Sequence, residues 1–187
     1  MKFKTLKLWL LLASLCGVAS AENIAYVPKA APGTDGAGEE WPTPRFVVNG
    51  DCVTDNLTGL IWAKNADLFG QKAWRIGSNP NYTYPAQEAI DAMNGSDPSA
   101  TGYHLCAYSD WRLPNQKELL SLLNYAATSG NSQNWLTTQN FTNVKNRYWS
   151  STTYDSSNVW YVQMSTGANS KQAMSGNGYV WPVRGGQ

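Results

Sequence analysis

The chain has 187 residues, a formal net charge of +1 and only 14% charged residues. Its lysines and arginines form no run, whereas nucleic acid and anionic membranes need a clustered basic surface in their partners. We therefore expect no nucleic-acid partner. Nine tryptophans and ten tyrosines stand against four phenylalanines, and the first two residue types suit both cores and wet interfaces because each joins an apolar ring to a polar group.

Residues 1–21 are predicted to be a signal peptide. Three lysines precede an apolar run over residues 8–18, and Ala-Ser-Ala at 19–21 is the small-x-small pattern that signal peptidase recognises. Cleavage before Glu22 removes three positive charges and no acid, which moves the formal charge from +1 to −2. The apolar run is too short to span a bilayer comfortably, so no membrane insertion is expected after cleavage. The protein is expected to be exported, to the periplasm, the cell surface or the medium.

The cysteines support an oxidising compartment. Cys16 lies in the removed segment, and its lipidation is disfavoured because the bulky Leu15 precedes it. Cys52 and Cys106 remain, and an even count predicts one disulfide that stabilises the fold by about 3–4 kcal/mol. Two buried free thiols are the alternative. No metal site is expected, because His104 is the only histidine and no Cys-x-x-Cys spacing occurs.

The domain is expected over residues 45–187. Before it, residues 22–44 contain four prolines and three glycines without an apolar period, which predicts a linker or N-terminal arm. Apolar and β-branched residues at 46–48 and 52–54 flank Asn49-Gly50. Because Asn-Gly favours type I′ turns, these segments predict a β-hairpin.

Two helices are expected. Pro85 opens the first, and Asn94-Gly95 ends it. Asn115 is a good N-cap for the second, with Glu118 three residues later in a capping box. Leucines then recur at helical spacing until residues 129–131, which contain a glycine, end the helix.

The other elements are expected to be strands. Residues 60–64 predict a buried strand, and residues 65–82 read as loop. Near the C-terminus, residues 147–153, 159–165 and 179–184 are rich in β-branched and aromatic side chains, which predicts antiparallel strands. Helices followed by strands predict an α+β fold.

Four motifs occur in a characteristic order. They are Asp-Asn-Leu-Thr-Gly-Leu-Ile-Trp at 55–62, Asp-Trp-Arg-Leu-Pro at 110–114 with Glu118 after it, Tyr-Trp-Ser-Ser-Thr at 148–152 and Pro-Val-Arg at 182–184. With these motifs the chain resembles the Lcl C-terminal domain family, a bacterial family named for a collagen-like adhesin. The resemblance covers roughly residues 45–184.

This resemblance implies a C-type-lectin-like fold, similar to that of formylglycine-generating enzymes, with two helices and a small antiparallel sheet. It also implies an extracellular binding role, since the named adhesin is associated with sulfated glycosaminoglycans. Two features depart from the family. Pro182 stands where a cysteine is often found, and no collagen-like repeat precedes the domain. Trimeric adhesion through such a repeat is therefore not implied.

A ligand is expected to contact the surface of residues 154–181. Tyrosine and tryptophan give rigid contact area there, while serine, glycine and asparagine adapt their hydrogen bonds. Strand alternation turns about half of the strand side chains inward, so the tryptophans suit the core as well as they suit a ligand. The candidate ligand-binding residues are Tyr154, Asp155, Asn158, Trp160, Asn169, Lys171, Asn177 and Tyr179.

The function expected is that of a non-catalytic adhesin or receptor module that binds a glycan or a protein. The alternative is a structural subunit of a bacterial surface assembly. An enzyme on the same scaffold is disfavoured, because Asp110 can pair with Arg112 or cap the turn and Glu118 can complete the helix cap, which leaves neither carboxylate free for acid–base work. No cofactor is expected, although calcium held by loop oxygens stays an open alternative. The sequence does not indicate the oligomeric state.

Overall fold

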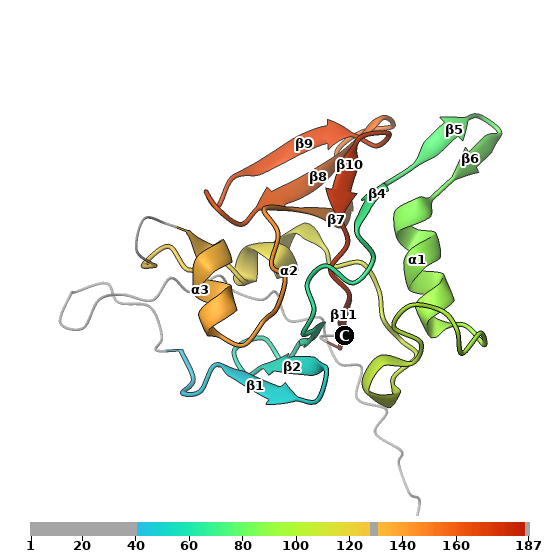
Figure 1. Cartoon of the computed structure of the whole chain (residues 1–187). Helices are drawn as coiled ribbons and strands as arrows, with labels where there is room; N and C mark the ends of the chain where they lie inside the picture. Colours follow the sequence, from blue (N-terminus) through green and yellow to red (C-terminus); the bar gives the residue numbers. More distant parts are fainter. Residues whose placement is uncertain (1–40, 128–130, 186–187) are drawn as a thin grey trace, which may run out of the picture.

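The protein is described here by a computed structural model that covers residues 41–127 and 131–185. The predicted signal peptide, most of the predicted arm and part of the predicted end of the second helix lie outside these residues. Two sheets form the body, and Figure 1 shows them in separate layers with helices α2 and α3 beside them. A small hairpin lies apart from both sheets. The mixture of helices and antiparallel strands confirms the α+β class.

The first sheet has the strand order β1-β2-β3-β11, and all its pairs are antiparallel. The predicted hairpin is present, but its type I′ turn is wrong. Asn49 pairs with Cys52, so Gly50 and Asp51 are the two central residues. Only Gly50, with φ +61°, has a positive φ, whereas type I′ requires it at both. The bounds are β1 (Phe46–Asn49), β2 (Cys52–Asp55), β3 (Ile61–Ala63) and β11 (Val183–Arg184).

The second sheet has the order β4-β10-β7-β8-β9, and only β10 and β7 run parallel. The single strand predicted over residues 179–184 is therefore wrong: β10 belongs to this sheet and β11 to the first. Between them Val180 and Trp181 are buried as the chain crosses from one sheet to the other. The bounds are β4 (Gln71–Ala73), β7 (Arg147–Thr153), β8 (Asn158–Gln163), β9 (Asn169–Ala173) and β10 (Asn177–Tyr179).

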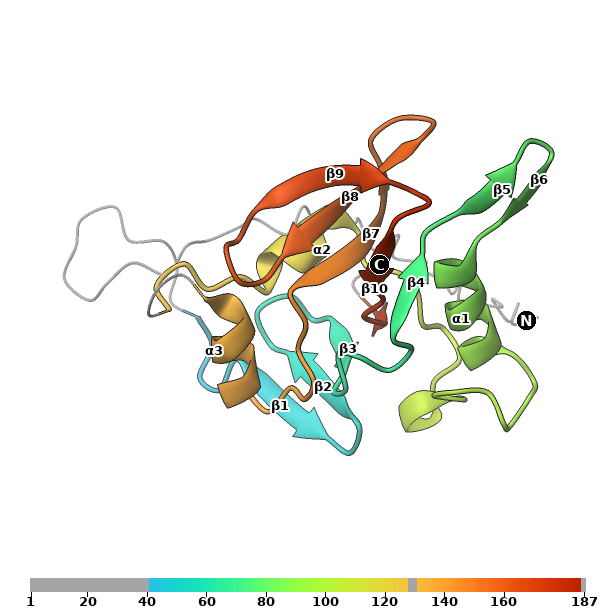
Figure 2. The same ribbon diagram turned by 45° about the horizontal axis from the view of Figure 1, so that its top comes forward.

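Strands β5 (Ile76–Ser78) and β6 (Asn81–Thr83) form the separate hairpin. Both views show it projecting from the body (Figures 1 and 2). Together with β4, it shows that the loop predicted over residues 65–82 is wrong. All six strand residues of the hairpin are exposed, so no face of it required the apolar alternation by which a strand is recognised.

Helix α1 (Pro85–Asn94) confirms the first predicted helix and buries Ala86, Ile90 and Met93. Helix α2 (Gln116–Ser121) has the predicted capping box between Asn115 and Glu118 but ends earlier than expected. Arg45 Nη2 donates to the carbonyl of Ser121 at 2.6 Å, which is the carbonyl that a longer helix would bond to the N–H of residue 125.

Two further helical segments were not predicted. Helix α3 (Ser132–Thr138) makes the expected number of two helices wrong, and a short 3₁₀ turn, η1 (Leu105–Ala107), precedes the second family motif. Asn131 caps α3 by accepting from the N–H of Asn134 at 3.1 Å. The sequence predicts that Asn131 helps to end the preceding helix, whereas in the structure it begins the next one.

The second and third motifs contact each other. The N–H of Ser151 donates to the carbonyl of Pro114 at 2.8 Å, and the N–H of Gln116 donates to Thr152 Oγ1 at 3.1 Å. These bonds attach the start of α2 to β7. The two sequence patterns are therefore two halves of one contact inside the scaffold.

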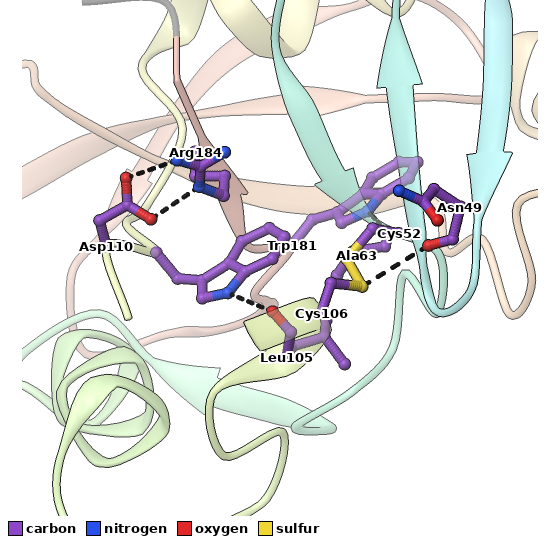
Figure 3. Close-up of a disulfide and its surroundings, with 9 residues drawn as sticks. Asn49, Cys52, Ala63, Leu105, Cys106, Asp110, Trp181 and Arg184 are labelled. Carbon is purple, nitrogen blue, oxygen red and sulfur yellow. Dashed lines mark hydrogen bonds and ion pairs between the residues drawn. A yellow bond between two sulfur atoms is a disulfide. The ribbon is translucent and has the colours of Figure 1, made fainter. Parts of the chain in front are cut away.

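The expected pairing of Asp110 with Arg112 is wrong. Asp110 accepts from the guanidinium of Arg184 at 2.6 and 3.0 Å, beside the disulfide in Figure 3. Arg112 instead holds Glu118 with two bonds of 2.8 and 2.7 Å and donates to the carbonyl of Gly185. The Arg184 guanidinium lowers the pKa of the Asp110 carboxyl below its usual value. The Arg184–Asp110 ion pair and the hydrogen bond from Arg112 to Gly185 thus fasten residues 184–185 to the second motif.

The disulfide joins Cys52 in β2 to Cys106 in η1, 54 residues apart (Figure 3). A cross-link over a loop of this length lowers the entropy of the unfolded chain, which stabilises the folded state by about 4 kcal/mol in the chain-entropy model. The double variant Cys52→Ser, Cys106→Ser should lose most of that free energy of unfolding in a urea titration. Thiol reduction of the unchanged protein should give the same shift, and an unaltered midpoint in both would contradict it.

Gly178 in β10 lies against the ring of Trp149, and a Cβ added there would come within 2.7 Å of Trp149 Cε2. Trp149 is fully buried, and its Nε1 donates to the carbonyl of Lys72, so the ring cannot move aside freely. We expect Gly178→Ala to lower the free energy of unfolding by about 1–3 kcal/mol through overpacking. Ser175→Ala, at an exposed turn position, is the control and should leave the denaturation midpoint unchanged.

Candidate ligand-binding surface

Five of the eight candidate residues come together around the β7–β8 turn. We call Tyr154, Asp155, Asn158, Trp160 and Lys171 the aromatic cluster. The rings of Tyr154 and Trp160 meet edge to face at 5.1 Å between centroids. Lys171 on β9 pairs in register with Trp160 on β8, and its Nζ lies 4.0 Å from the centre of the Tyr154 ring. Tyr154 is 47% exposed, so this arrangement faces solvent.

Asp155 makes the turn of this cluster rigid. Its Oδ1 accepts from the N–H groups of Ser157 at 2.8 Å and Asn158 at 2.7 Å. The Asn158 amide also donates to both carboxylate oxygens at 3.0 Å. These bonds favour the ionised form, led by the Ser157 N–H, and lower the pKa of Asp155 below its usual value. The turn therefore holds Tyr154 and Asn158 in fixed positions.

The other three candidate residues lie away from the cluster centre. Asn169 starts β9, two residues before Lys171, and is exposed on the same face of the strand. Asn177 and Tyr179 lie on β10, which β7 separates from β8. Tyr179 is half-buried, with its ring 6.3 Å from that of Tyr148 and 5.7 Å from Lys145 Nζ. The structure thus brings Asn169 near the cluster and places the β10 pair elsewhere.

The β5–β6 hairpin is a neighbour of the cluster that the sequence did not reveal. Arg75, just before β5, donates from Nη2 to the carbonyl of Ser156 in the β7–β8 turn at 2.7 Å. Its guanidinium lies 4.2 Å from the centre of the Tyr82 ring. The hairpin exposes Ile76 and Tyr82. The Tyr-Thr-Tyr alternation at 82–84 after the Asn-Pro at 79–80 was the one available signal for it.

Three cations lie against aromatic rings rather than carboxylates, and one of them, Arg147, is on the other face of the sheet from Lys171, because its ring partner Tyr161 is adjacent to Trp160 on β8. Besides Lys171 and Arg75, the guanidinium of Arg147 lies 4.7 Å from the centre of the Tyr161 ring and donates to Gln172 at 2.6 Å. None of the three belongs to the ion pairs found within residues 41–127 and 131–185. Their charge is therefore available to an anionic or electron-rich ligand.

The groups considered for catalysis have structural partners. Ser150 is buried, and its hydroxyl donates to the carbonyl of Trp160 at 2.9 Å. Asp110 and Glu118 hold arginines, as described above. His104 stacks on Tyr103 at 3.9 Å and bonds the carbonyl of Gly95. Within the described part of the chain, no three His, Cys, Asp or Glu side chains gather in a way that suits a metal ion.

The family of the chain follows from a direct comparison. The Lcl C-terminal domain profile matches residues 51–184, which is more than half of the 187 residues. The chain belongs to this family. No curated protein matches it significantly. The motifs by which the Lcl family is recognised make scaffold contacts here: Asp55, for example, is fully buried and accepts from the guanidinium of Arg45 at 3.0 and 2.9 Å.

Among the described residues, no helix is long and apolar enough to pass through a lipid bilayer. The Cys52–Cys106 disulfide of this Lcl-family domain is typical of an oxidising compartment and is consistent with an extracellular protein.

The turn of the aromatic cluster should depend on pH through Asp155. Because its folded pKa is depressed, the carboxylate bonds stabilise the turn above the unfolded value of about 3.9 and are lost as the pH falls through the folded pKa. A carboxyl NMR titration should give a midpoint below that of a peptide covering residues 152–159. The amide signals of Ser157 and Asn158 should shift with the same midpoint. A midpoint at or above the peptide value would contradict the geometry.

Proposed function

We propose that the protein is an exported, non-catalytic ligand-binding module of adhesin or receptor type, built on a C-type-lectin-like scaffold. It recognises an extracellular glycan or protein through the aromatic cluster. One observation carries the proposal: the ammonium group of Lys171 lies over the exposed ring of Tyr154, beside Trp160, on a turn fixed by Asp155.

The chemistry of the cluster supports an anionic ligand, and among glycans an acidic one. Tyr154 and Trp160 give rigid surfaces on which sugar rings or apolar side chains stack. Lys171 adds a cation, and Arg75 adds a second at the neighbouring hairpin. The association of the family with surface adhesion agrees with this assignment.

The absence of catalysis is part of the proposal. The carboxylates and the serine that would serve as acid, base or nucleophile are engaged in bonds that hold the scaffold, as described above. Asp155, the carboxylate within the cluster, is likewise occupied by the N–H groups of its own turn. These partners favour a site that binds and releases its ligand unchanged.

The proposal is tested by presenting the protein to a glycan array that includes sulfated glycosaminoglycans, with calcium and with a chelator. We expect binding to acidic glycans, and Lys171→Ala should weaken it about tenfold, the loss that one desolvated cation–ring contact or ion pair gives. Lys64→Ala removes a lysine that follows β3 in the other sheet and should have no effect. Equal responses to calcium and chelator are expected.

A blank array would contradict glycan recognition and leave a protein ligand as the alternative form of the proposal. Pull-down of a partner by the unchanged protein, but not by Lys171→Ala or Tyr154→Ala, would then identify the same surface. Partner binding that both variants retain would contradict a role for the aromatic cluster.

A structural subunit of a surface assembly is the second candidate. Strand β1 is at the edge of its sheet and exposes Val47 at 41% and Val48 at 38%. An apolar edge strand without Lys or Pro is a template for pairing with another chain. Concentration-dependent assembly in sedimentation experiments, abolished by Val48→Lys, would favour this candidate over a monomeric receptor.

A further inference from the structure

A second open cleft lies beside α3, away from the aromatic cluster. Its volume is about 680 Å³, which falls in the range of roughly 300–1,000 Å³ that ligand pockets occupy. Trp135 forms one wall. Residues 126–127 and four polar residues complete the lining: Asn124, Asn131, Asn134 and Thr138. None of these residues belongs to the aromatic cluster.

The Trp135 ring is held in place from behind. It lies 5.8 Å from the ring of Phe46 and 5.5 Å from that of Trp41, both in tilted geometry. A smaller cleft, of about 270 Å³, is lined by Trp41, Trp135, Asn124 and their neighbours. Trp135 therefore separates two hollows and offers part of its indole to the larger one.

The asparagines of the larger cleft are also fixed. The N–H of Asn124 donates to the hydroxyl of the buried Ser132 at 2.8 Å, and its Oδ1 accepts from the N–H of Ala126 at 3.0 Å. Asn131 Oδ1 accepts from the N–H of Asn134 at 3.1 Å. The acceptor oxygens of Asn124 and Asn131 are thus used within the chain, which leaves their amide N–H groups directed to other partners.

The free hydrogen-bonding groups of this cleft are mainly donors. Within the described residues, no acceptor is found for the Nδ2 groups of Asn124 and Asn131 or for Trp135 Nε1, and the Asn134 side chain makes no bond at all. Among the described residues, no charged side chain belongs to the lining. The Trp135 indole suits the apolar face of a sugar ring, and the neutral amides suit its hydroxyl oxygens. The described lining residues offer no partner to a charged group of a ligand.

We propose that this cleft is a binding site for an uncharged saccharide of one or two rings. The sugar stacks on Trp135, and its oxygens accept from the amides of Asn124, Asn131 and Asn134. This site is separate from the aromatic cluster, which contains Lys171 and suits acidic ligands. Either site can exist without the other.

The test uses saturation-transfer NMR of the purified protein with neutral disaccharides: maltose, cellobiose, lactose and diacetylchitobiose. At least one should bind. Asn134→Ala should weaken binding about tenfold, the effect of losing one hydrogen bond in a small site. Asn134 is exposed and its side chain makes no bond in the fold, so this variant should remain folded. Trp135→Phe keeps a ring against Phe46, removes the indole N–H and should also weaken binding.

Two controls separate this site from the other. Thr137→Ala changes α3 outside the cleft and should leave sugar binding unaltered, as should Lys171→Ala. The proposal is overturned if no neutral disaccharide binds. It is equally overturned if binding survives both Asn134→Ala and Trp135→Phe, or if Lys171→Ala abolishes it, since the sugar would then occupy the aromatic cluster.

Discussion

The two sheets depend on one buried side chain, Trp181, which lies where the chain crosses between them. Its indole N–H donates to the carbonyl of Ala63 at 2.8 Å, across 118 residues of sequence. Its ring meets Trp62 at 5.5 Å, Phe141 at 5.1 Å and Tyr148 at 4.8 Å. The Trp181 ring thus contacts Trp62 of the first sheet, Tyr148 of the second sheet and Phe141 of the segment between α3 and β7. Because these contacts of Trp181 hold the two sheets together, they also fix the positions of residues on one sheet relative to residues on the other.

The family motifs serve that framework and leave the binding surfaces free. The Asp-Trp-Arg-Leu-Pro segment bonds to β11 and, through Arg112, holds Glu118 of α2, and the Tyr-Trp-Ser-Ser-Thr strand bonds to it through Ser151. The aromatic cluster lies on β8, β9 and the turn before β8, and the Trp135 cleft lies on α3 and the segment before it, all outside the four motifs. Since the scaffold bonds do not involve those positions, their side chains can change without loss of the fold. Membership of the Lcl family therefore identifies the scaffold of this domain and does not identify its ligand.

The sequence predicted elements whose signal is local. The capping box at Asn115, the proline start of α1 and the β-branched and aromatic composition of residues 147–153 are each read from neighbouring residues, and the cap, the helix start and strand β7 are all present. The missed features depend on distant partners. Helix α2 stops because Arg45, far away in sequence, takes the carbonyl of Ser121, and the β5–β6 hairpin has no buried face that would create a pattern. The cluster around Tyr154 was within reach because its residues lie close together along the chain. The Trp135 cleft is lined by the α2–α3 connection and by α3, and because α3 was not predicted, the sequence could not place these residues on one surface.

The late position of β11 affects how the protein forms. During synthesis, which starts at the N-terminus, one edge of β3 stays unpaired and Trp62 is not covered by the Trp181 ring until residues 181–184 have been made. The second sheet has all its strands once residues 177–179 are made, whereas the first sheet and the cover of Trp62 wait for residues 181–184. Many contacts join segments that are distant in sequence, which slows folding. A product that stops short of residues 181–184 exposes tryptophan surface and becomes a substrate for quality-control proteases.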